Sequence, residues 1–498
     1  MDESPNTILT SLKNTFKSGK TREFKWRQQQ LKSLRMLISD NIELISKTAY
    51  DEFKRAEEET YIFELGLCLS EIDNLKSNMK RFCSKKILAK SVAQITDRIA
   101  VYKEPKGVVL VITSWNVPYL LAFQGIAGAI AAGNCVLLKP SELAPKSADL
   151  LKDLIPKYLD TDAVKVICGG VEETKTILNE KFDHILFTGS QTVGRCIAQI
   201  AAKSLTPVTL ELGGKVPAVV DANSDLKVTA RRIIWGKFLG CGQLCSAVDY
   251  VLVMDVAKPV LIKHMLEVLD EFFGEKPATE RSYGRIINEK HFDRLVTLLN
   301  STRGVLEHGG KFNRETLFIE PTIVSGVLST DPLMDDEIFG PICPVIDVST
   351  INDAISFIQQ RPKPLAAYIF SNSSFIVNKF VDQVSAGSIL ANDTLLVHSA
   401  DNLPKGGIGD SGIGSYVGYS SIEAFSNHKS VIISNQSLDC LKAIRYPPYT
   451  CQKFKFLKFA MRRYVLPRNE LFENLLWFLT GCLIVHIIYI FFINKTYD

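Results

Sequence analysis

Residues 1–84 show the hydrophobic pattern of amphipathic helices. Apolar positions recur every three or four residues, for example in WRQQQLKSLRMLISDNIELISKTAYDEF, and polar or charged residues fill most positions between them. This spacing places the apolar side chains on one face of a helix. The sequence therefore predicts a helical N-terminal layer that packs against another part of the protein.

From about residue 97 the pattern changes to short β-branched runs that Pro and Gly interrupt. The runs are IAVYKEPKGVVLVIT, NCVLLKP, VKVICGG and FDHILFTGS, and stretches with helical spacing follow them. Strands that alternate with helices at this interval form right-handed crossovers and a parallel sheet. The predicted fold class is therefore α/β, with a Rossmann-like parallel sheet.

Residues 475–493 form a third pattern, LLWFLTGCLIVHIIYIFFI, without a formally charged side chain. As a helix rising about 1.5 Å per residue, this segment would span roughly 28 Å, which is close to the hydrocarbon thickness of a bilayer. Residues 440–474 carry eight Lys and Arg side chains, all of them before residue 469. Basic flanks stay on the cytosolic side of a membrane. We expect a tail anchor at 475–493, a basic juxtamembrane linker at 440–474, and a cytosolic position for the bulk of the protein.

Composition excludes several classes of protein. The chain has 498 residues, of which 46% are hydrophobic and 22% charged, so we expect a folded protein of several domains. A net charge of +4 is small for this length and argues against a nucleic-acid-binding surface. Eleven cysteines, an odd number, without an N-terminal secretory segment indicate free thiols in a reducing compartment. Cys241 and Cys245 have no second Cys or His pair nearby, so we expect no metal site.

Two strand-end loops have features of a dinucleotide site. In FDHILFTGSQTVGRCIAQIAA, a strand, a turn and a helix could present helix N-terminal amides to a pyrophosphate, although G-S-x-x-x-G differs from the usual G-x-G-x-x-G. In LLKPSE, Lys139 and Glu142 follow a strand, where they could bind sugar hydroxyls; a carboxylate there favours NAD over NADP. Either loop alone is also compatible with an ordinary connection. The candidate residues of the first loop are Gly189, Ser190, Gln191, Thr192, Val193 and Gly194.

Further motifs follow in a fixed order along the chain. They are SWNVP at 114–118, LELGGK at 210–215, GCGQLCSAVD at 240–249, GRIIN at 284–288, DDEIFGP at 335–341 and GGIGDSGIGSYVG at 406–418. Together with the two loops, these motifs resemble the aldehyde dehydrogenase superfamily, from about residue 5 to about residue 435. The basic segment and the apolar tail resemble its membrane-anchored fatty aldehyde dehydrogenase branch.

The resemblance implies a role for each motif residue. Cys245 matches the nucleophile that forms a thiohemiacetal and then a thioester, Asn116 matches an oxyanion donor, and Glu211 matches the general base. Glu337 matches the carboxylate that holds the nicotinamide ribose, and Phe339 matches the aromatic residue beside the nicotinamide. An ordinary thiol is only a few per cent ionised at pH 7, so the site must supply a base or a positive field. Cys241 lacks such partners and is interpreted as a packing residue.

The resemblance also implies an architecture and partners. We expect an NAD-binding domain from 1–84 and 107–210, a catalytic domain from 211–390, and a bridging β element from 85–106 and 391–435 that pairs subunits into a homodimer. The expected activity is NAD-dependent oxidation of medium- to long-chain aldehydes to carboxylic acids. The expected location is the endoplasmic reticulum membrane, with the peroxisome and the mitochondrial outer membrane as alternatives.

Several residues depart from the family pattern. Ser114 stands where proline is usual, and Leu244 and Ser246 flank the nucleophile. Lys405 in PKGGIG replaces a phenylalanine that lines the aldehyde path in the family. Its stem could follow that path with the ammonium at the rim, whereas a buried ammonium would disfavour a long hydrocarbon. Two alternatives therefore stay open: the same chemistry on smaller aldehydes, and a catalytically weakened membrane-anchored scaffold.

Overall fold

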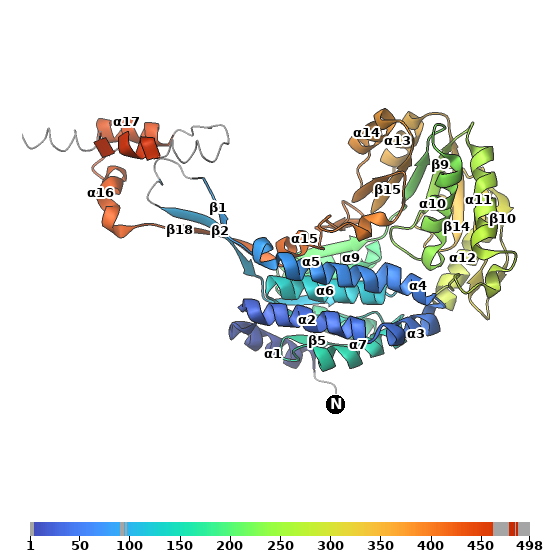
Figure 1. The fold of residues 1–498 in the computed structure, drawn as a ribbon, viewed down its shortest axis with the longest axis horizontal. Coiled ribbons are helices and arrows are strands. Elements are labelled where there is room, and N and C mark those ends of the chain that lie inside the picture. The colour runs from blue at the N-terminus through green and yellow to red at the C-terminus, as the bar shows by residue number, and fades with distance from the viewer. Residues whose placement is uncertain (1–3, 90–93, 95–96, 462–477, 484, 487–498) are drawn as a thin grey trace, which may run out of the picture. The chain divides into compact units, whose positions relative to one another are not determined.

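The computed structural model describes residues 4–89, 94, 97–461, 478–483, 485 and 486. The chain forms two compact units. The first combines residues 1–84 with 103–428, and the second combines 85–102 with 429–498. The first unit contains two large sheets with their helices (Figure 1).

The first sheet has the strand order β17-β7-β6-β3-β4-β5. All neighbouring strands are parallel except β17, which runs antiparallel to β7. The chain enters this sheet at the central strand β3 and adds β4 and β5 on one side of it. It then crosses back and adds β6 and β7 on the other side of β3. This topology confirms the predicted Rossmann-like sheet and places its switch point between β3 and β6. The strands are β3 (Val108–Ile112), β4 (Cys135–Lys139), β5 (Val164–Val166), β6 (His184–Gly189), β7 (Val208–Leu212) and β17 (Gly412–Ile413).

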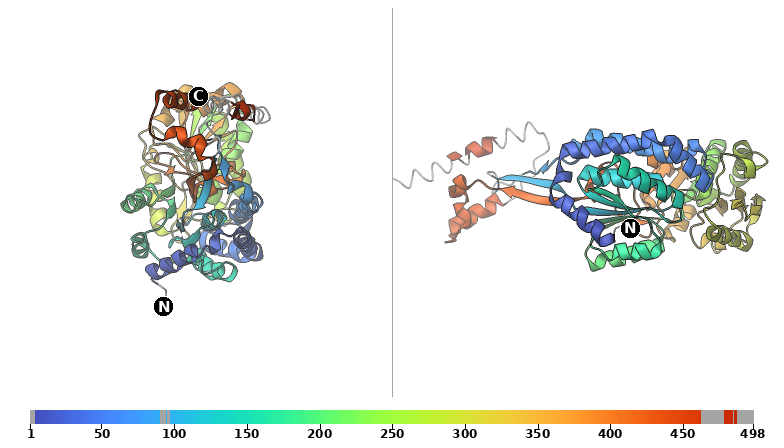
Figure 2. Two further views of the ribbon diagram at one scale, coloured as in Figure 1. Left: turned by 90° about the vertical axis from the view of Figure 1, so that its left-hand side faces the viewer. Right: turned by 90° about the horizontal axis from the view of Figure 1, so that it is seen from below.

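Helices cover both faces of the first sheet (Figure 2). Successive strand side chains point to opposite faces, so Val109 and Val111 lie in one core and Val108 and Leu110 in the other. The first core includes the predicted N-terminal helical layer except for α1 (Pro5–Lys17). Its helices are α2 (Phe24–Asp40), α3 (Ile42–Phe53), α5 (Gly66–Phe82), α6 (Pro118–Ala132) and α7 (Pro145–Tyr158). Those of the second core are α1 (Pro5–Lys17), α8 (Val171–Leu178) and α9 (Gln191–Lys203).

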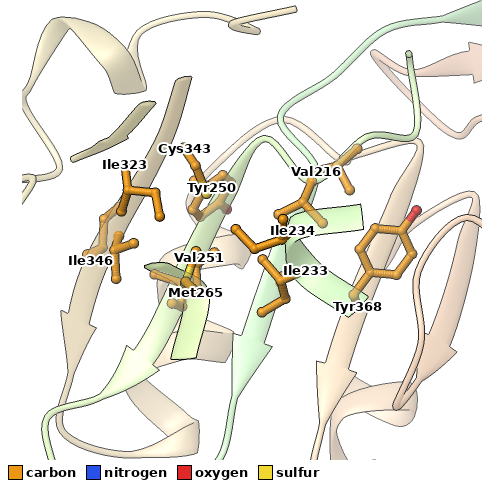
Figure 3. Packing of buried hydrophobic residues seen from close by; sticks show 14 of the residues in the cluster. Val216, Ile233, Ile234, Tyr250, Val251, Met265, Ile323, Cys343, Ile346 and Tyr368 are labelled. Carbon is orange, nitrogen blue, oxygen red and sulfur yellow. The ribbon is translucent and has the colours of Figure 1, made fainter. Parts of the chain in front are cut away.

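The second sheet has the order β10-β13-β14-β9-β8-β15-β16 and is parallel except at its edge strand β10. Its inner strands β8, β9, β13 and β15 are almost entirely buried because both faces are covered, whereas the edge strands β10 and β16 are partly exposed. Ile233 and Ile234 of a flanking helix lie with Val251 and Met265 in this core (Figure 3). The strands are β8 (Pro217–Val220), β9 (Tyr250–Met254), β10 (Val305–His308), β13 (Thr322–Ser325), β14 (Ile342–Val348), β15 (Ala366–Phe370) and β16 (Ser388–Ala391). The helices are α10 (Leu226–Phe238), α11 (Lys258–Phe273), α12 (Glu289–Ser301), α13 (Ile351–Gln359) and α14 (Ser374–Gln383).

The predicted boundary between the two large domains needs correction. Glu211 pairs with Thr188 of β6 and with Gly412 of β17, so it belongs to the first sheet. The chain leaves this sheet only at the glycine pair 213–214, because the strand signal of LEL continues past residue 210. The segment 391–435 is also divided, since β17 joins the first sheet and α15 (Tyr419–Ala424) belongs to the first unit.

The second unit contains β1 (Lys86–Ile87), most of β2 (Arg98–Pro105) and most of β18 (Ser426–Ile433), which form a three-stranded sheet in the order β1-β2-β18. Two helices follow, α16 (Asp439–Lys442) and α17 (Cys451–Ala460). No helix within the described part of the chain is long and apolar enough to cross a membrane. Most of the tail anchor predicted at 475–493, and the end of the basic linker before it, lie outside the described residues.

Candidate active site

A cavity of about 380 Å³ lies where the two large sheets meet. The carboxyl ends of β3, β6 and β7 contribute the loops on one side of it, and the segments that precede β8, β9 and β14 contribute the other. Ligands of parallel α/β sheets bind outside the carboxyl ends of the strands, at the switch point. The cavity is therefore in the expected place for a nucleotide-dependent site.

Most residues predicted from the sequence line this one cavity. The cavity also includes Ser114, Leu244, Ser246 and Lys405, which depart from the family pattern. Lys139, Glu142, Val193 and Gly194 do not line it. The predicted residues that do are Asn116, Gly189, Ser190, Gln191, Thr192, Glu211, Cys245, Glu337 and Phe339.

Cys245 lies in a loop that requires glycine. Gly240, Cys241 and Gly242 precede it, and all three have positive φ. A Cβ on Gly242 would collide with the carbonyl of Gly340, so this loop contacts the backbone that follows Phe339. Cys241 is buried in the core of the second sheet and does not line the cavity.

The surroundings of Cys245 keep its thiol protonated. Burial raises the pKa of Cys245 to about 12, and the negative charges of Glu211 and Glu337 act in the same direction. The positive charge of Lys405 lowers the pKa and is the largest opposing effect. A thiolate is the reactive form, so this site depends on a base or a cation to produce it.

Glu211 is a buried carboxylate without a hydrogen bond. Its side chain lies at the end of β7 and is 1% exposed, and neither carboxylate oxygen has a partner among the described residues. Loss of hydration raises its pKa, while the positive charge of Lys405 lowers it. An unpartnered buried acid is costly for stability and is typical of a proton-transfer site.

Asn116 is held so that its amide nitrogen points toward the loop that carries Cys245. The Ser114 hydroxyl donates to Asn116 Oδ1 at 2.6 Å, and Asn116 Nδ2 donates to the carbonyl of Gln243 at 3.0 Å. A primary amide has two N–H groups, so one remains for an oxyanion. Ser114, one of the departures from the family pattern, thus fixes the orientation of this amide.

A buried ion network supports both loops. Arg55 contacts Glu64 at 2.5 Å and donates to the carbonyl of Asn116 at 2.6 Å. Glu64 lies in the π-helical segment η2 (Tyr61–Leu65) and accepts the amides of Tyr119 and Leu120 at the N-terminus of α6. Glu59, in α4 (Glu57–Thr60), accepts the amide of Gly240 at 2.8 Å. No sequence motif indicated this network.

Lys215 fixes the loop that carries Glu337 and Phe339. The Lys215 ammonium contacts Asp249 at 2.5 Å and donates to the carbonyl of Asp336 at 3.0 Å, while Asp249 accepts the amide of Ile338. Glu337 lies against Gly213, where a Cβ would collide with its carboxylate.

Two features of this loop bear on its function. Burial, together with the charge of Asp249, raises the pKa of Glu337 to about 8. Phe339 has a φ of 49° and packs edge-on against Trp115 with ring centroids 5.5 Å apart. A positive φ at a bulky residue stores strain, which is common at functional sites.

The turn between β6 and α9 fits a dinucleotide. Ser190 caps α9 by accepting the amide of Val193, and a Cβ on Gly194 would press into Leu212. The amides of Gln191 and Thr192 have no partner among the described residues and are available to a phosphate.

At the end of β4, next to β3, Lys139 pairs with Glu142 at 2.6 Å. This places one ammonium and one carboxylate where the sequence predicted sugar contacts. The residues that could hold a dinucleotide are therefore the two free helix amides, the buried carboxylate of Glu337 and the ring of Phe339.

Sequence reasoning missed part of the lining. Phe63 and Leu67 come from the N-terminal helical layer, and Arg195, His291 and Arg294 come from helices α9 and α12. Arg195 lies in the quoted stretch FDHILFTGSQTVGRCIAQIAA but was not among its candidate residues, and the other four belong to no quoted motif. Only the tertiary fold brings them to the cavity.

Comparison with known proteins assigns a family. The model of the "Aldehyde dehydrogenase family" matches residues 3–431. The mouse protein "Aldehyde dehydrogenase, dimeric NADP-preferring" is 42% identical over 443 residues, which cover 89% of this chain and 97% of that protein. The rat protein "Aldehyde dehydrogenase family 3 member A2" is 39% identical over 450 residues, covering 90% and 93%. The solved structure "Substrate bound state of Staphylococcus Aureus AldH" superposes with a TM-score of 0.90 at 37% identity, covering 93% of this chain and all of that one.

Proposed function

The chain belongs to the aldehyde dehydrogenase family, and from this premise we propose that it oxidises medium- to long-chain aldehydes to carboxylic acids with NAD as the hydride acceptor. The observation that supports the proposal most is the cavity that contains Cys245, Asn116 and Glu211 together. It combines a nucleophile, an oxyanion donor and an unpartnered buried base.

The residues have distinct tasks in this reaction. Cys245 Sγ loses its proton and bonds to the aldehyde carbon, and the resulting oxyanion accepts hydrogen bonds from Asn116 Nδ2 and the Cys245 amide. NAD, when bound, would supply the hydride acceptor that oxidation of the thiohemiacetal to a thioester requires. Glu211 then takes a proton from water, whose oxygen attacks the thioester carbon and releases the acid and the thiol.

The substrate preference follows from the apolar side of the cavity. Its lining there is Phe63, Leu67, Val117, Leu120, Leu121 and Leu244. Each buried methylene contributes about 0.8 kcal/mol, or roughly fourfold in kcat/KM, until the apolar surface is filled. We therefore expect longer aldehydes to react better than short ones.

A series of aldehydes from propanal to hexadecanal tests this proposal. NADH formation is measured with purified protein at equal substrate concentrations below KM. The proposal expects kcat/KM to rise with chain length and then level off. A maximum at propanal would favour the smaller-aldehyde alternative, and no NADH across the series would favour the scaffold.

The choice of NAD over NADP rests on Glu142. Its carboxylate is partly exposed beside Lys139, where it would repel a ribose 2′-phosphate. The mouse relative is named NADP-preferring, so the preference of this chain must be measured directly. We expect a higher kcat/KM with NAD, and a higher value with NADP would overturn the assignment.

Membrane attachment through 475–493, with the catalytic part in the cytosol, is also proposed. The exposed surface of α17 supports it, because Phe454, Phe456 and Phe459 alternate there with lysines. A fluorescent tag on the full chain should mark the endoplasmic reticulum, and the chain lacking residues 440–498 should become diffuse. Fluorescence in peroxisomes or mitochondria would show that the anchor selects that organelle instead. An unchanged pattern in the truncated chain would show that residues 440–498 do not anchor the protein.

A homodimer is proposed through the three-stranded sheet. β18 is an edge strand, and its Ile432 and Ile433 are more than half exposed. Exposed edges of this kind pair readily with another strand. Sedimentation in detergent should give twice the chain mass, and I433K should shift the distribution toward monomer; a wild-type monomer would contradict the proposal.

A further inference from the structure

Lys405 reaches the active site on a segment that is hydrogen-bonded to the strand of Glu211. The backbones of Lys405 and Tyr416 exchange hydrogen bonds of 3.0 and 2.8 Å, so the chain between them closes into a loop. Within that loop, Gly412 pairs with Glu211. The loop therefore fixes the position of Lys405 relative to the carboxylate.

The side chain of Lys405 has no direct ionic partner among the described residues. Its ammonium makes no hydrogen bond or ion pair within the part of the chain that the structure describes, although Lys405 lines the same cavity as Glu211 and Cys245. The ammonium lies 5.5 Å from the centroid of the Tyr416 ring, which is fully buried. A cation is therefore held close to two acidic groups without being neutralised by contact with either.

We infer that Lys405 is a positioning residue whose ammonium stabilises the thiolate of Cys245 and the carboxylate of Glu211 before cofactor binds. This inference rests on the proposed function, in which Cys245 is the nucleophile. The thiol proton is released to solvent, and no bond to Lys405 forms. A residue that departs from the family pattern would thus supply the positive field that the thiol needs.

Lys405 is the cation whose charge favours the Cys245 thiolate, and the two carboxylates around the thiol oppose it. Glu211 and Glu337 both raise the pKa of Cys245, and Lys405 lowers it. The hydroxyls of Tyr368 and Tyr416 also face Cys245, but burial raises their pKa values and keeps them neutral. Lys405 therefore opposes two carboxylates.

Other acidic groups also face Lys405. Cys68 and Glu71 lie on α5, and the charge of Lys405 lowers the pKa of each. Burial nevertheless raises the pKa of Glu71 to about 7 and keeps Cys68 protonated. A full charge several ångströms away shifts a pKa by about one to two units at the effective dielectric of such a site.

The test is the pH dependence of Cys245 alkylation in the full-length protein without cofactor. Iodoacetamide labelling is followed over time by mass spectrometry of the peptide that contains Cys245, which separates it from exposed Cys196 and Cys451. K405M and K405F should raise the thiol pKa by about one unit and slow labelling about tenfold at pH 7.5. K405R should keep the wild-type profile, and K203M, at an exposed site on α9, should change nothing.

Two results would overturn the inference. One is an unchanged pH profile in folded K405M and K405F, and the other is an equal slowing in K405R, which would point to shape rather than charge. Because labelling needs no turnover, the result is independent of the dehydrogenase assay. A shifted profile together with an active C245S enzyme would retain the Lys405 effect and reject the proposed role of Cys245.

Discussion

Two carboxylates of this enzyme are equally buried but have opposite surroundings. Glu64 is inaccessible and is satisfied by Arg55 and by two backbone amides at the start of α6. Glu211 is 1% exposed, and neither of its oxygens has a hydrogen-bond partner among the described residues. The first region links distant parts of the chain, whereas the second leaves both carboxylate oxygens of Glu211 free to accept a proton, as the proposed reaction requires.

The difference shows that hydrogen-bond and ionic partners, at equal burial, distinguish a structural acid from one that can accept a proton. Burial raises the pKa of both groups, to about 6 for Glu64. In the Glu64 region, an ion pair and hydrogen bonds offset much of the cost of burying charge. In the Glu211 region, only the charge of Lys405 offsets it, so the carboxylate retains its capacity to accept a proton.

The largest expected effect comes from removing the proposed nucleophile, Cys245. C245S should lower kcat/KM by about 10,000-fold or more, because a serine hydroxyl is far less ionised than a thiol. Aldehyde-dependent NADH formation measures the loss. C241S is the matched control, since Cys241 is buried in the core and does not line the cavity; equal losses in both variants would remove Cys245 from the mechanism.

Breaking the structural region should reduce stability. R55M leaves Glu64 buried without its cation, which should cost about 3–5 kcal/mol of unfolding free energy at pH 8. The pKa of Glu64 is raised, so its uncharged form predominates at low pH and the loss should be smaller at pH 5. Urea denaturation at the two pH values measures this difference.

The control for R55M is R35M. Arg35 forms an exposed pair with Asp73, so its loss should cost less than about 1 kcal/mol. Equal losses of unfolding free energy in R35M and R55M would show that the Glu64 network contributes no more to stability than an exposed ion pair.

Removing the reactive carboxylate should separate activity from stability. E211Q should lower kcat by about 100- to 1000-fold with little loss of unfolding free energy, because the charged form of Glu211 destabilises the fold. Because the pKa of Glu211 is raised, kcat/KM should rise with pH as this carboxyl group loses its proton. This rise in the pH profile should be absent in E211Q. E64Q should show the reverse pattern: a clear loss of unfolding free energy with a smaller effect on kcat. A large loss of stability in E211Q would contradict the distinction.

The smallest predicted change concerns the cofactor. E142Q removes the carboxylate that would repel a 2′-phosphate, so the NADP to NAD ratio of kcat/KM should rise about tenfold. Initial rates with each cofactor measure the ratio. An unchanged ratio would place cofactor selection elsewhere.

The sequence predicted the local parts of this site better than its supports. Cys245, Asn116 and Glu211 are each marked by a short motif, and the β3 and β6 strands by continuous apolar runs, so local pattern is sufficient for them. Arg55 and Glu64 precede the first predicted strand, and the backbone groups that they bind, at Asn116 and Tyr119, lie far along the chain.

The domain boundary that the resemblance implies at residue 211 falls inside a strand, because Glu211 and Leu212 still pair with β6 of the first sheet. The lining by Phe63 depends on how a helix packs on the first sheet, which periodicity does not specify.

The central claim is that Cys245 carries the acyl group and that Glu211 releases it. The most direct test is mass spectrometry of the peptide containing Cys245 after acid quenching of E211Q incubated with hexadecanal and NAD. The account predicts one acyl group per chain on Cys245, with a matching burst of NADH and little further turnover. NADH formation without an acyl group on Cys245, or with the acyl group on another cysteine, would contradict it.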